Sequence, residues 1–370
     1  MATSYKSFAR ERCRCIIKDM LSLHRVSFDQ FDEYALQHPK GNFHQTAQMA
    51  RFRELMGWDV HPLLVFSGDT PVGAMILAGK SRRYEITMGP LFDFSETVST
   101  QECMTLIASY VKGLKGLLVE VYPYELYQMH DSAGGVVSSR KQSRLVEGFE
   151  ENGWRHKGFT TNYDPTANRW VFVKDLSDIS SESALLASYR QTTRQTVRKL
   201  NAADYTVKKM TYDDLEVVKK LVDSSNDKNN VSTRPLDYYQ RLFAAFKDSV
   251  EFLVVYHKQE IPIATGVFIY HPNEVVYFMS GADSKYRDLY GGHFLQHFMM
   301  TKCIEAGVKR YNFYGISGHF TNNPLLVYKA GFRGFVEEYV GGFYKPLVPG
   351  GMVTLKAIRA GGMVRRRVGL

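Results

Sequence analysis

The feature that most constrains the fold of this chain is an internal repeat of two hairpin patterns. Residues 61–77 (HPLLVFSGDTPVGAMIL) and 251–269 (EFLVVYHKQEIPIATGVFI) follow one plan: an apolar strand, a polar turn, a proline and a second apolar strand. Apolar runs of this length around a short polar turn are typical of β-hairpins. Their recurrence far apart in the chain predicts two copies of one structural unit.

Each hairpin is followed by the same series of segments: a strand, a helix and a returning strand. These segments are 82–92, 102–114 and 115–123 in the first copy, and 274–282, 291–307 and 308–316 in the second. An antiparallel meander followed by a helix and a returning strand is the layout of the N-acetyltransferase-like (GNAT) fold. We therefore expect an α/β protein with two tandem GNAT-like domains, the first over residues 1–168 and completed by 341–370, the second over 169–340.

Composition excludes several classes of protein. No apolar run in the 370 residues reaches the roughly 18 to 20 residues of a membrane span, and we expect a cytoplasmic protein. The four cysteines, Cys13, Cys15, Cys103 and Cys303, are too few and too unevenly spread for a disulfide framework, and no spacing indicates a metal site. The net charge of +9 favours an anionic partner. Charge alone does not distinguish among nucleic acid, an acidic membrane face and a phosphorylated metabolite.

A basic stripe lies between the two copies. Arg190, Arg194 and Arg198 are spaced four apart in a segment with a helical pattern, so they are expected on one helix face. A solvated surface is one interpretation. Contact with the phosphates of a nucleic acid is the one we favour in so basic a protein.

The segment 324–331, PLLVYKAG, places a lysine in a short apolar helix. Pro324 suits a helix start and Gly331 a helix stop. Lys329, in the last turn, either complements the helix dipole or serves a functional site.

A glycine-rich turn at residues 286–296, YRDLYGGHFLQ, precedes the helix of the second copy. Arg287, Gly291 and Gly292 stand where acyl-CoA-dependent GNAT enzymes cradle pyrophosphate, but the bulky Leu289 and Tyr290 occupy the centre. The first copy has no such turn. These residues disfavour acyl-CoA as a co-substrate.

Together these segments resemble the Fem family of peptidoglycan aminoacyltransferases (FemA, FemB, FemX and MurM-like proteins). The resemblance spans roughly residues 24–348 and is most specific in 38–58, 232–242, 275–296 and 325–347. Phe246 runs almost directly into the strand at Glu251, so the sequence is similar to the compact FemX type, which lacks a coiled-coil arm.

The resemblance implies roles for individual residues. Arg234, Tyr238 and Tyr277 match positions that hold the peptidoglycan precursor, and Arg53 stands where the compact type has lysine. Tyr328 and Lys329 match a Phe-Lys pair implicated in handling the aminoacyl-tRNA and in the transfer. Two further positions depart from the family pattern: Met279 replaces a tyrosine and Tyr122 an aspartate.

The implied function is transfer of an amino acid of the Ser, Ala or Gly class from aminoacyl-tRNA to the stem-peptide amine of UDP-MurNAc-pentapeptide or lipid II. Aminoacyl-tRNA is then a co-substrate, and no cofactor or metal is expected. Lys329 is expected to stabilise the oxyanion, and Arg190, Arg194 and Arg198 to bind tRNA. The basic termini are expected to contact tRNA or the inner membrane leaflet, or only to aid solubility. The alternatives are an acyl-CoA N-acyltransferase and a non-catalytic tRNA- or membrane-associated binding protein.

Overall fold

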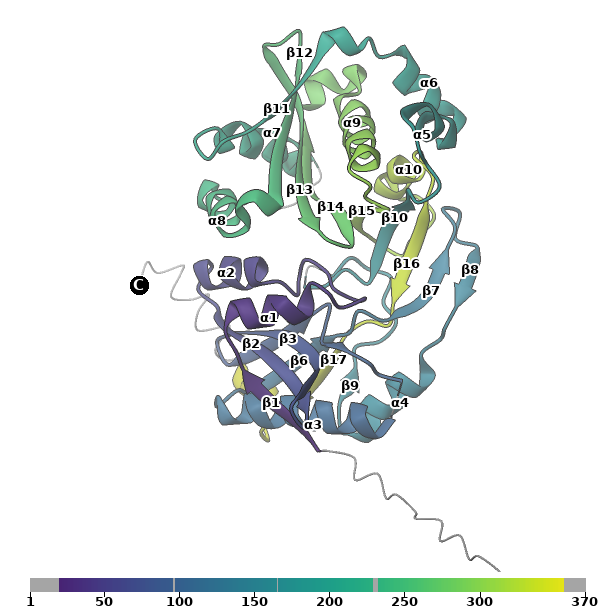
Figure 1. Cartoon of the computed structure of the whole chain (residues 1–370). Coiled ribbons are helices and arrows are strands. Elements are labelled where there is room, and N and C mark those ends of the chain that lie inside the picture. The colour runs from purple at the N-terminus through teal and green to yellow at the C-terminus, as the bar shows by residue number, and fades with distance from the viewer. Residues whose placement is uncertain (1–19, 96, 165, 229–231, 356–370) are drawn as a thin grey trace, which may run out of the picture.

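The computed structural model describes residues 20–95, 97–164, 166–228 and 232–355. Two mixed β-sheets, each with helices on both faces, form a lower and an upper unit in Figure 1. The described helices are α1 (Phe28–Ala35), α2 (Ala47–Leu55), α3 (Thr97–Gly113), α4 (Ser143–Glu151), α5 (Glu182–Ser188), α6 (Gln191–Lys199), α7 (Leu215–Lys228), α8 (Leu236–Phe246), α9 (Gly291–Glu305) and α10 (Pro324–Ala330).

The first sheet contains the first predicted hairpin as β2 and β3, beside the edge strand β1. Its strands, in spatial order, are β1 (Leu21–Arg25), β2 (Asp59–Ser67), β3 (Thr70–Lys80), β4 (Arg83–Thr87), β6 (Leu118–Tyr122), β17 (Phe343–Pro346) and β9 (Arg155–His156), and β5 (Leu91–Phe92) pairs with β3. Alternate residues of β2 and β3 face opposite sides. Leu63 and Met75 pack towards α3 and α4, whereas Leu64 and Ile76 pack towards α1 and α2.

The second sheet repeats this plan around the second hairpin. Its strands, in spatial order, are β11 (Tyr205–Lys209), β12 (Val250–His257), β13 (Ile261–His271), β14 (Glu274–Ala282), β15 (Arg310–Ile316), β10 (Trp170–Asp175), β16 (Phe335–Tyr339), β7 (Leu126–His130) and β8 (Val136–Ser139). Helices α5, α6, α9 and α10 cover one face, and α7 and α8 cover the other. The predicted hairpins, helices and returning strands are confirmed in both copies.

The two units exchange strands. The C-terminal strand β17 lies between β6 and β9 in the first sheet. In return, β7 and β8, which the proposed domain limits assign to the first unit, extend the edge of the second sheet: β7 pairs with β16, and β8 pairs with β7. Each sheet is therefore completed by a segment from the other half of the chain.

The second sheet opens between β14 and β15. These parallel strands pair only at Val275 with Tyr311 and at Val276 with Asn312. Beyond these pairs β15 carries a register shift against β10, where Phe172 pairs with Tyr314 and Val173 with Asn312, leaving Phe313 as an extra residue. A bulge of this kind bends a strand and redirects its side chains.

A shared core joins the two units. Phe43, Met49 and Phe52, in and before α2, pack into the cluster formed by α7, α8 and the inner face of the second sheet. The ring of Phe52 lies 5.3 Å from that of Tyr238 on α8, in an edge-on contact. Figure 1 shows α2 of the lower unit facing α8 of the upper one. This core fixes the position of one sheet relative to the other.

The close approach of α7 to β14 gives a test of the second unit. A Cβ on Gly281 would lie 2.4 Å from the carbonyl oxygen of Leu221 and 2.5 Å from the Cα of Val222, both backbone atoms of α7. We expect Gly281→Ala to lower the free energy of unfolding by about 2 kcal/mol in urea denaturation, because backbone cannot move aside cheaply. The control is Gly148→Ala in α4, where a Cβ meets nothing within 4 Å. Equal stability of the two variants would contradict this packing.

Candidate active site

Three predicted substrate-binding residues converge at the junction of the two units. Arg53 comes from the last turn of α2, Arg234 lies two residues before α8, and Tyr238 lies in the first turn of α8. Two residues that the sequence analysis did not identify, His44 before α2 and Tyr314 in β15, complete the group. We call these five residues, His44, Arg53, Arg234, Tyr238 and Tyr314, the interface cluster.

Arg53 is held in place by the first sheet. Its guanidinium donates to Thr87 Oγ1 at 2.8 Å and lies 3.5 Å from the carboxylate of Glu85. Burial lowers the pKa of Arg53, and the nearby Glu85 opposes that effect. Across the junction, the exposed Arg234 lies 5.0 Å over the ring of Tyr238, a cation–π contact. The cluster therefore presents two guanidinium groups beside phenol rings.

Tyr314 links the units through its side chain. Its hydroxyl oxygen lies 3.1 Å from Nε2 of His44, at hydrogen-bonding distance. Its ring contacts Phe43 and Phe278, each with a centroid separation of 5.6 Å. Desolvation raises the pKa of Tyr314 well above its usual value, and Tyr238 adds to this effect while Arg53 opposes it. Tyr314 thus lies within electrostatic range of both predicted binding residues.

The backbone of Tyr314 adopts the left-handed conformation, with φ of 64°. A residue with a large side chain in this region costs of order 1 to 3 kcal/mol, so neighbouring groups must hold it there. The amide of Tyr314 donates to Oδ1 of Asn312 at 2.7 Å. Asn312 in turn donates to Glu274 at 2.9 Å. The strained position is therefore supported by side chains of the sheet itself.

Lys329 is buried, with 4% of its surface exposed. Its Nζ donates to the backbone carbonyl oxygens of Phe313 at 2.6 Å, Tyr314 at 3.2 Å and Gly315 at 2.9 Å. Burial lowers the pKa of Lys329 to about 7, while the carbonyl contacts favour the charged form. The ammonium group points away from bulk water and into β15.

Tyr328, the neighbour of Lys329, lies at a pocket of about 680 Å³ between α6, α9 and α10. We call it the α6–α10 pocket. Its lining contains hydroxyl, amide and aromatic groups and one arginine: Arg190, Thr192, Thr193, Thr196, His293, Asn322, Asn323, Pro324, Val327, Tyr328 and Gly331. The described lining contains no carboxylate, and the ring of His293 meets that of Tyr328 edge-on at 5.1 Å.

Tyr277 does not join the interface cluster. It is buried on the α9 face of β14, where its ring stacks on Phe268 with centroids 5.3 Å apart. Tyr277 also interacts electrostatically with Tyr328: the pKa of Tyr328 is raised mainly by burial and partly by Tyr277. The structure thus places Tyr277 on the side of Tyr328, and Tyr238 on the opposite face of the sheet.

The predicted arginine stripe is only partly a helix face. Helix α6 begins at Gln191, so Arg194 and Arg198 share a face, whereas Arg190 precedes the helix with extended backbone. Arg190 donates to Ser132 Oγ and lines the α6–α10 pocket. Arg194 donates to the carbonyl of Ala187 at 3.2 Å, and Arg198 is exposed. The geometry separates Arg190 from the other two because the helix starts one residue later than the spacing suggests.

The turn before α9 does not fit a pyrophosphate group. A Cβ on Gly291 would lie 2.8 Å from Ile263, and one on Gly292 would lie 3.2 Å from the hydroxyl of Tyr328. These glycines therefore allow close packing against β13 and Tyr328. Arg287 is exposed and lies 3.6 Å from Asp288.

Two absences concern the described part of the chain. Within residues 20–95, 97–164, 166–228 and 232–355, no group of three His, Cys, Asp or Glu residues is arranged to hold a metal ion. In the same ranges, no helix combines the length and apolar character needed to cross a membrane. Cys103 and Cys303 are buried free thiols. Cys13, Cys15 and nearly all of the basic termini lie outside the described residues.

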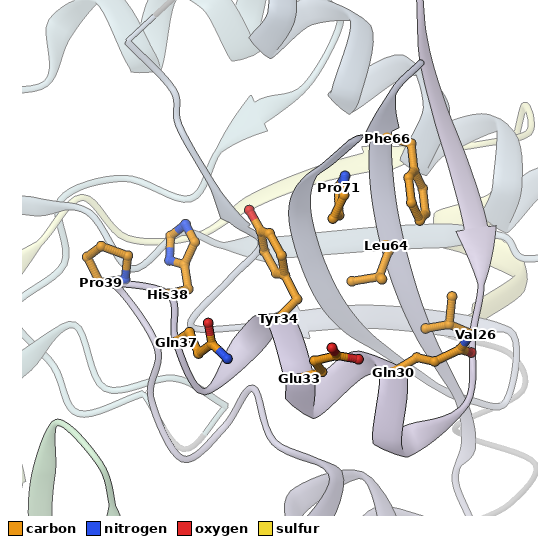
Figure 2. A pocket seen from close by; sticks show the side chains of 10 residues that line it. All are labelled: Val26, Gln30, Glu33, Tyr34, Gln37, His38, Pro39, Leu64, Phe66 and Pro71. Carbon is orange, nitrogen blue, oxygen red and sulfur yellow. The ribbon is translucent and has the colours of Figure 1, made fainter. Parts of the chain in front are cut away.

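A second hollow, of about 590 Å³, lies beside α1 in the first unit. Figure 2 shows Tyr34 and His38 on one side of it and Leu64, Phe66 and Pro71 from β2 and β3 on the other. None of the residues that the sequence analysis assigned to a site lines this hollow.

The fold defines the class of protein. In each unit a hairpin and a further strand are followed by a long helix and a returning parallel strand, which makes a tandem GNAT-like fold. The chain is similar to the structure of a tandem GNAT protein from the clavulanic acid pathway, with a TM-score of 0.54 and 11% identity over 89% of this chain and 99% of that one. It is also similar to the crystal structure of FemX, with a TM-score of 0.73 and 15% identity over 87% and 96% of the two chains.

The family model described as the FemAB family matches residues 26–258 and 255–351. The chain belongs to the FemAB family. Among curated relatives, aminoacyltransferase FemB of Staphylococcus epidermidis is 27% identical, covering 87% of this chain and 94% of that protein. The predicted family and the tandem GNAT fold are confirmed.

The buried histidine of the interface cluster makes stability depend on pH. Burial, assisted by Arg53, lowers the pKa of His44 to about 3. The folded state then binds fewer protons than the unfolded state between pH 6.5 and 3, so its stability is complete above pH 6.5 and falls on acidification. We expect His44 to contribute about 2 kcal/mol of the stability lost between pH 7 and pH 5.

This pH effect is measured by urea denaturation at both pH values. His44→Asn should show a smaller difference between pH 7 and pH 5 than the wild type. His24→Asn, at an exposed site, should keep the full difference. An unchanged difference in His44→Asn would show that this imidazole is not held neutral.

Proposed function

We propose that the protein transfers an amino acid of the Ser, Ala or Gly class from aminoacyl-tRNA to the stem-peptide amine of a peptidoglycan precursor. The membership of the FemAB family over most of the chain is the observation that carries this proposal. The acceptor is UDP-MurNAc-pentapeptide or its lipid-linked form, lipid II. The product is an interpeptide bridge.

The interface cluster suits the acceptor. A precursor of this class carries phosphates and a flexible peptide, and Arg53 and Arg234 supply guanidinium groups that bind phosphate with directed hydrogen bonds. The rings of Tyr238 and Tyr314 lie beside them and offer hydroxyl groups for the polar parts of the peptide or sugar. Arg53, Arg234 and Tyr238 remain our proposed binding residues. Tyr277 has less support as a precursor contact because it lies on the other face of the sheet.

The α6–α10 pocket suits the acceptor end of a charged tRNA. Its lining joins aromatic rings, on which unpaired bases and riboses stack, to hydroxyl and amide groups and to Arg190. The absence of carboxylates from the described lining avoids repulsion of phosphates. Tyr328, between this pocket and α9, is the proposed contact to the transferred end of the tRNA.

The reaction needs few protein groups. A neutral amine attacks the ester carbonyl, and an anionic tetrahedral intermediate forms. The ester bond to the ribose then breaks as the amide forms, and the proton lost by the amine ends on the leaving ribose oxygen. The oxyanion contact expected for Lys329 would require one of its three carbonyl bonds in β15 to be replaced. Orientation of the two substrates across β15 is therefore the main contribution we assign to this chain.

A transfer assay tests the proposed function. Labelled Ser-, Ala- or Gly-tRNA is incubated with lysine- or ornithine-containing UDP-MurNAc-pentapeptide or lipid II, and labelled muropeptide is measured. Arg234→Ala should raise the KM for the acceptor about tenfold or more with a small change in the KM for tRNA. Lys220→Ala, on the exposed surface of α7, is the control. No transfer from any of the charged tRNAs to either acceptor would overturn the function.

The tRNA contact gives a separate salt-dependent test. If Arg190 binds a phosphate, Arg190→Gln should weaken tRNA binding and reduce the slope of log affinity against log salt by about 0.7 to 0.9. Arg198→Gln should do the same if the exposed end of α6 also meets tRNA. Lys220→Gln should leave the slope unchanged. Equal slopes in all variants would exclude both Arg190 and the exposed end of α6 from the tRNA site.

Peripheral contact with the inner membrane face, and a cytoplasmic location, belong to this proposal as consequences of a lipid-linked acceptor. The basic termini that would carry such contact lie outside the described residues. Binding of the full chain to anionic vesicles, compared with neutral ones, would support this part of the proposal.

A further inference from the structure

We propose that Lys329 is a positioning residue: its ammonium group fixes the bulge at Phe313 and Tyr314, and through that bulge it sets the position of the Tyr314 hydroxyl in the interface cluster. The effect on transfer rests on the proposed function. The effect on the backbone of β15 does not.

The carbonyl geometry is the first support. In a regular strand, successive carbonyl groups point to opposite sides, so three in a row cannot meet at one atom. Here the oxygens of Phe313, Tyr314 and Gly315 all lie within 3.2 Å of Lys329 Nζ. They converge because the strand is bulged at Phe313 and turns through the left-handed conformation at Tyr314. The ammonium group therefore binds a backbone shape that the strand would not otherwise keep.

The burial of Lys329 is the second support. An ammonium group has three hydrogens, and three carbonyl oxygens accept from it. The side chain is 4% exposed, and Lys329 is absent from the lining of the α6–α10 pocket although Tyr328 and Gly331 belong to it. All three ammonium hydrogens are therefore bonded within the chain, so Lys329 affects a substrate only by way of the backbone of β15.

The direction of Tyr314 is the third support. Its carbonyl faces Lys329, whereas its hydroxyl lies 3.1 Å from His44 of the first unit. In an unbulged strand, each later residue would turn to the other face of the sheet. Removal of the ammonium group would therefore release both the left-handed backbone and the contact between Tyr314 and His44.

The second unit uses the same arrangement elsewhere. Lys174 is also 4% exposed, and its Nζ donates to the carbonyl oxygens of Phe332 at 2.9 Å and Arg333 at 3.4 Å, and to Ser188 Oγ at 2.9 Å. Arg333 has a φ of 54°, again left-handed. A buried lysine that binds carbonyls around a left-handed residue thus occurs at both sites. Lys174 supplies a matched control, because it holds a different turn.

The backbone part of the proposal is tested by thermal unfolding of the full chain. Lys329→Met keeps the length of the side chain, removes the charge and leaves the carbonyls unpaired, and we expect Tm to fall by about 5 °C or more. Glycine adopts the left-handed conformation without strain. In the Tyr314→Gly background, Lys329→Met should therefore lower Tm by no more than half as much. Lys174→Met should lower Tm equally in both backgrounds.

Two results would overturn this part. One is an unchanged Tm in Lys329→Met. The other is an equal fall of Tm in the wild-type and Tyr314→Gly backgrounds. If Lys329→Met alone yields no folded protein, recovery of soluble, cooperatively unfolding protein in the double variant supports the proposal, and no recovery overturns it.

The functional part is tested by a double-mutant cycle on transfer. Tyr314→Phe removes the hydroxyl and keeps the ring. If Lys329 acts by placing that hydroxyl, the double variant with Lys329→Met should be no slower than Lys329→Met alone, which we expect to lose about tenfold in rate. If the rate losses of the two single variants multiply in the double variant, Lys329 acts independently of Tyr314, and the positioning role is overturned. A wild-type chain without transfer activity would refute the proposed function, while the Tm comparison would still decide the role of Lys329.

Discussion

The shared core between α2 and the α7–α8 pair is the constraint on which the rest of the structure depends. Phe43, Met49 and Phe52 of the first unit belong to the same buried cluster as residues of α7, α8 and the second sheet. Interiors of this density deform little, so the two sheets keep a fixed relation. Because Arg53 directly follows Phe52 in α2 and Tyr238 packs against the same core, this core also fixes the spacing of the groups that we assign to the acceptor.

The strand β15 connects the two proposed substrate sites. One side of its bulge meets Lys329, whose neighbour Tyr328 lies at the α6–α10 pocket. The other side presents Tyr314 to the interface cluster. The limited pairing between β14 and β15 gives this strand room to bend. In this chain, the opening of the sheet thus supports a bent backbone as well as bounding a proposed binding site.

Much of this organisation could be predicted from the sequence. Apolar runs separated by polar turns predicted both hairpins. The family resemblance singled out Arg53, Arg234 and Tyr238, which the structure brings together. The position of Tyr277 could not be inferred, because the face of the sheet on which a strand side chain lies depends on register and bulges, and no local sequence pattern reveals these. Tyr314 was missed for a related reason: a left-handed tyrosine has no sequence signature of its own. The glycine that follows it, Gly315, against which Asn168 packs, was the one available sign of an irregular strand. The proposed domain boundary at 168 and 169 stays a prediction.

The exchange of strands between the units has a mechanical consequence. Since β17 closes the first sheet and β7 and β8 extend the second, the chain crosses the junction in both directions. Only residues 123–125 join β6 to β7, and only residues 340–342 join β16 to β17. A hinge that swings the two units widely apart would therefore have to break the pairing of these strands and lose their hydrogen bonds. The two proposed substrates, a nucleotide-linked peptide and a tRNA, would then be accommodated by side chains and surface loops of two units that keep a nearly fixed relation, and would approach from opposite faces of the second sheet.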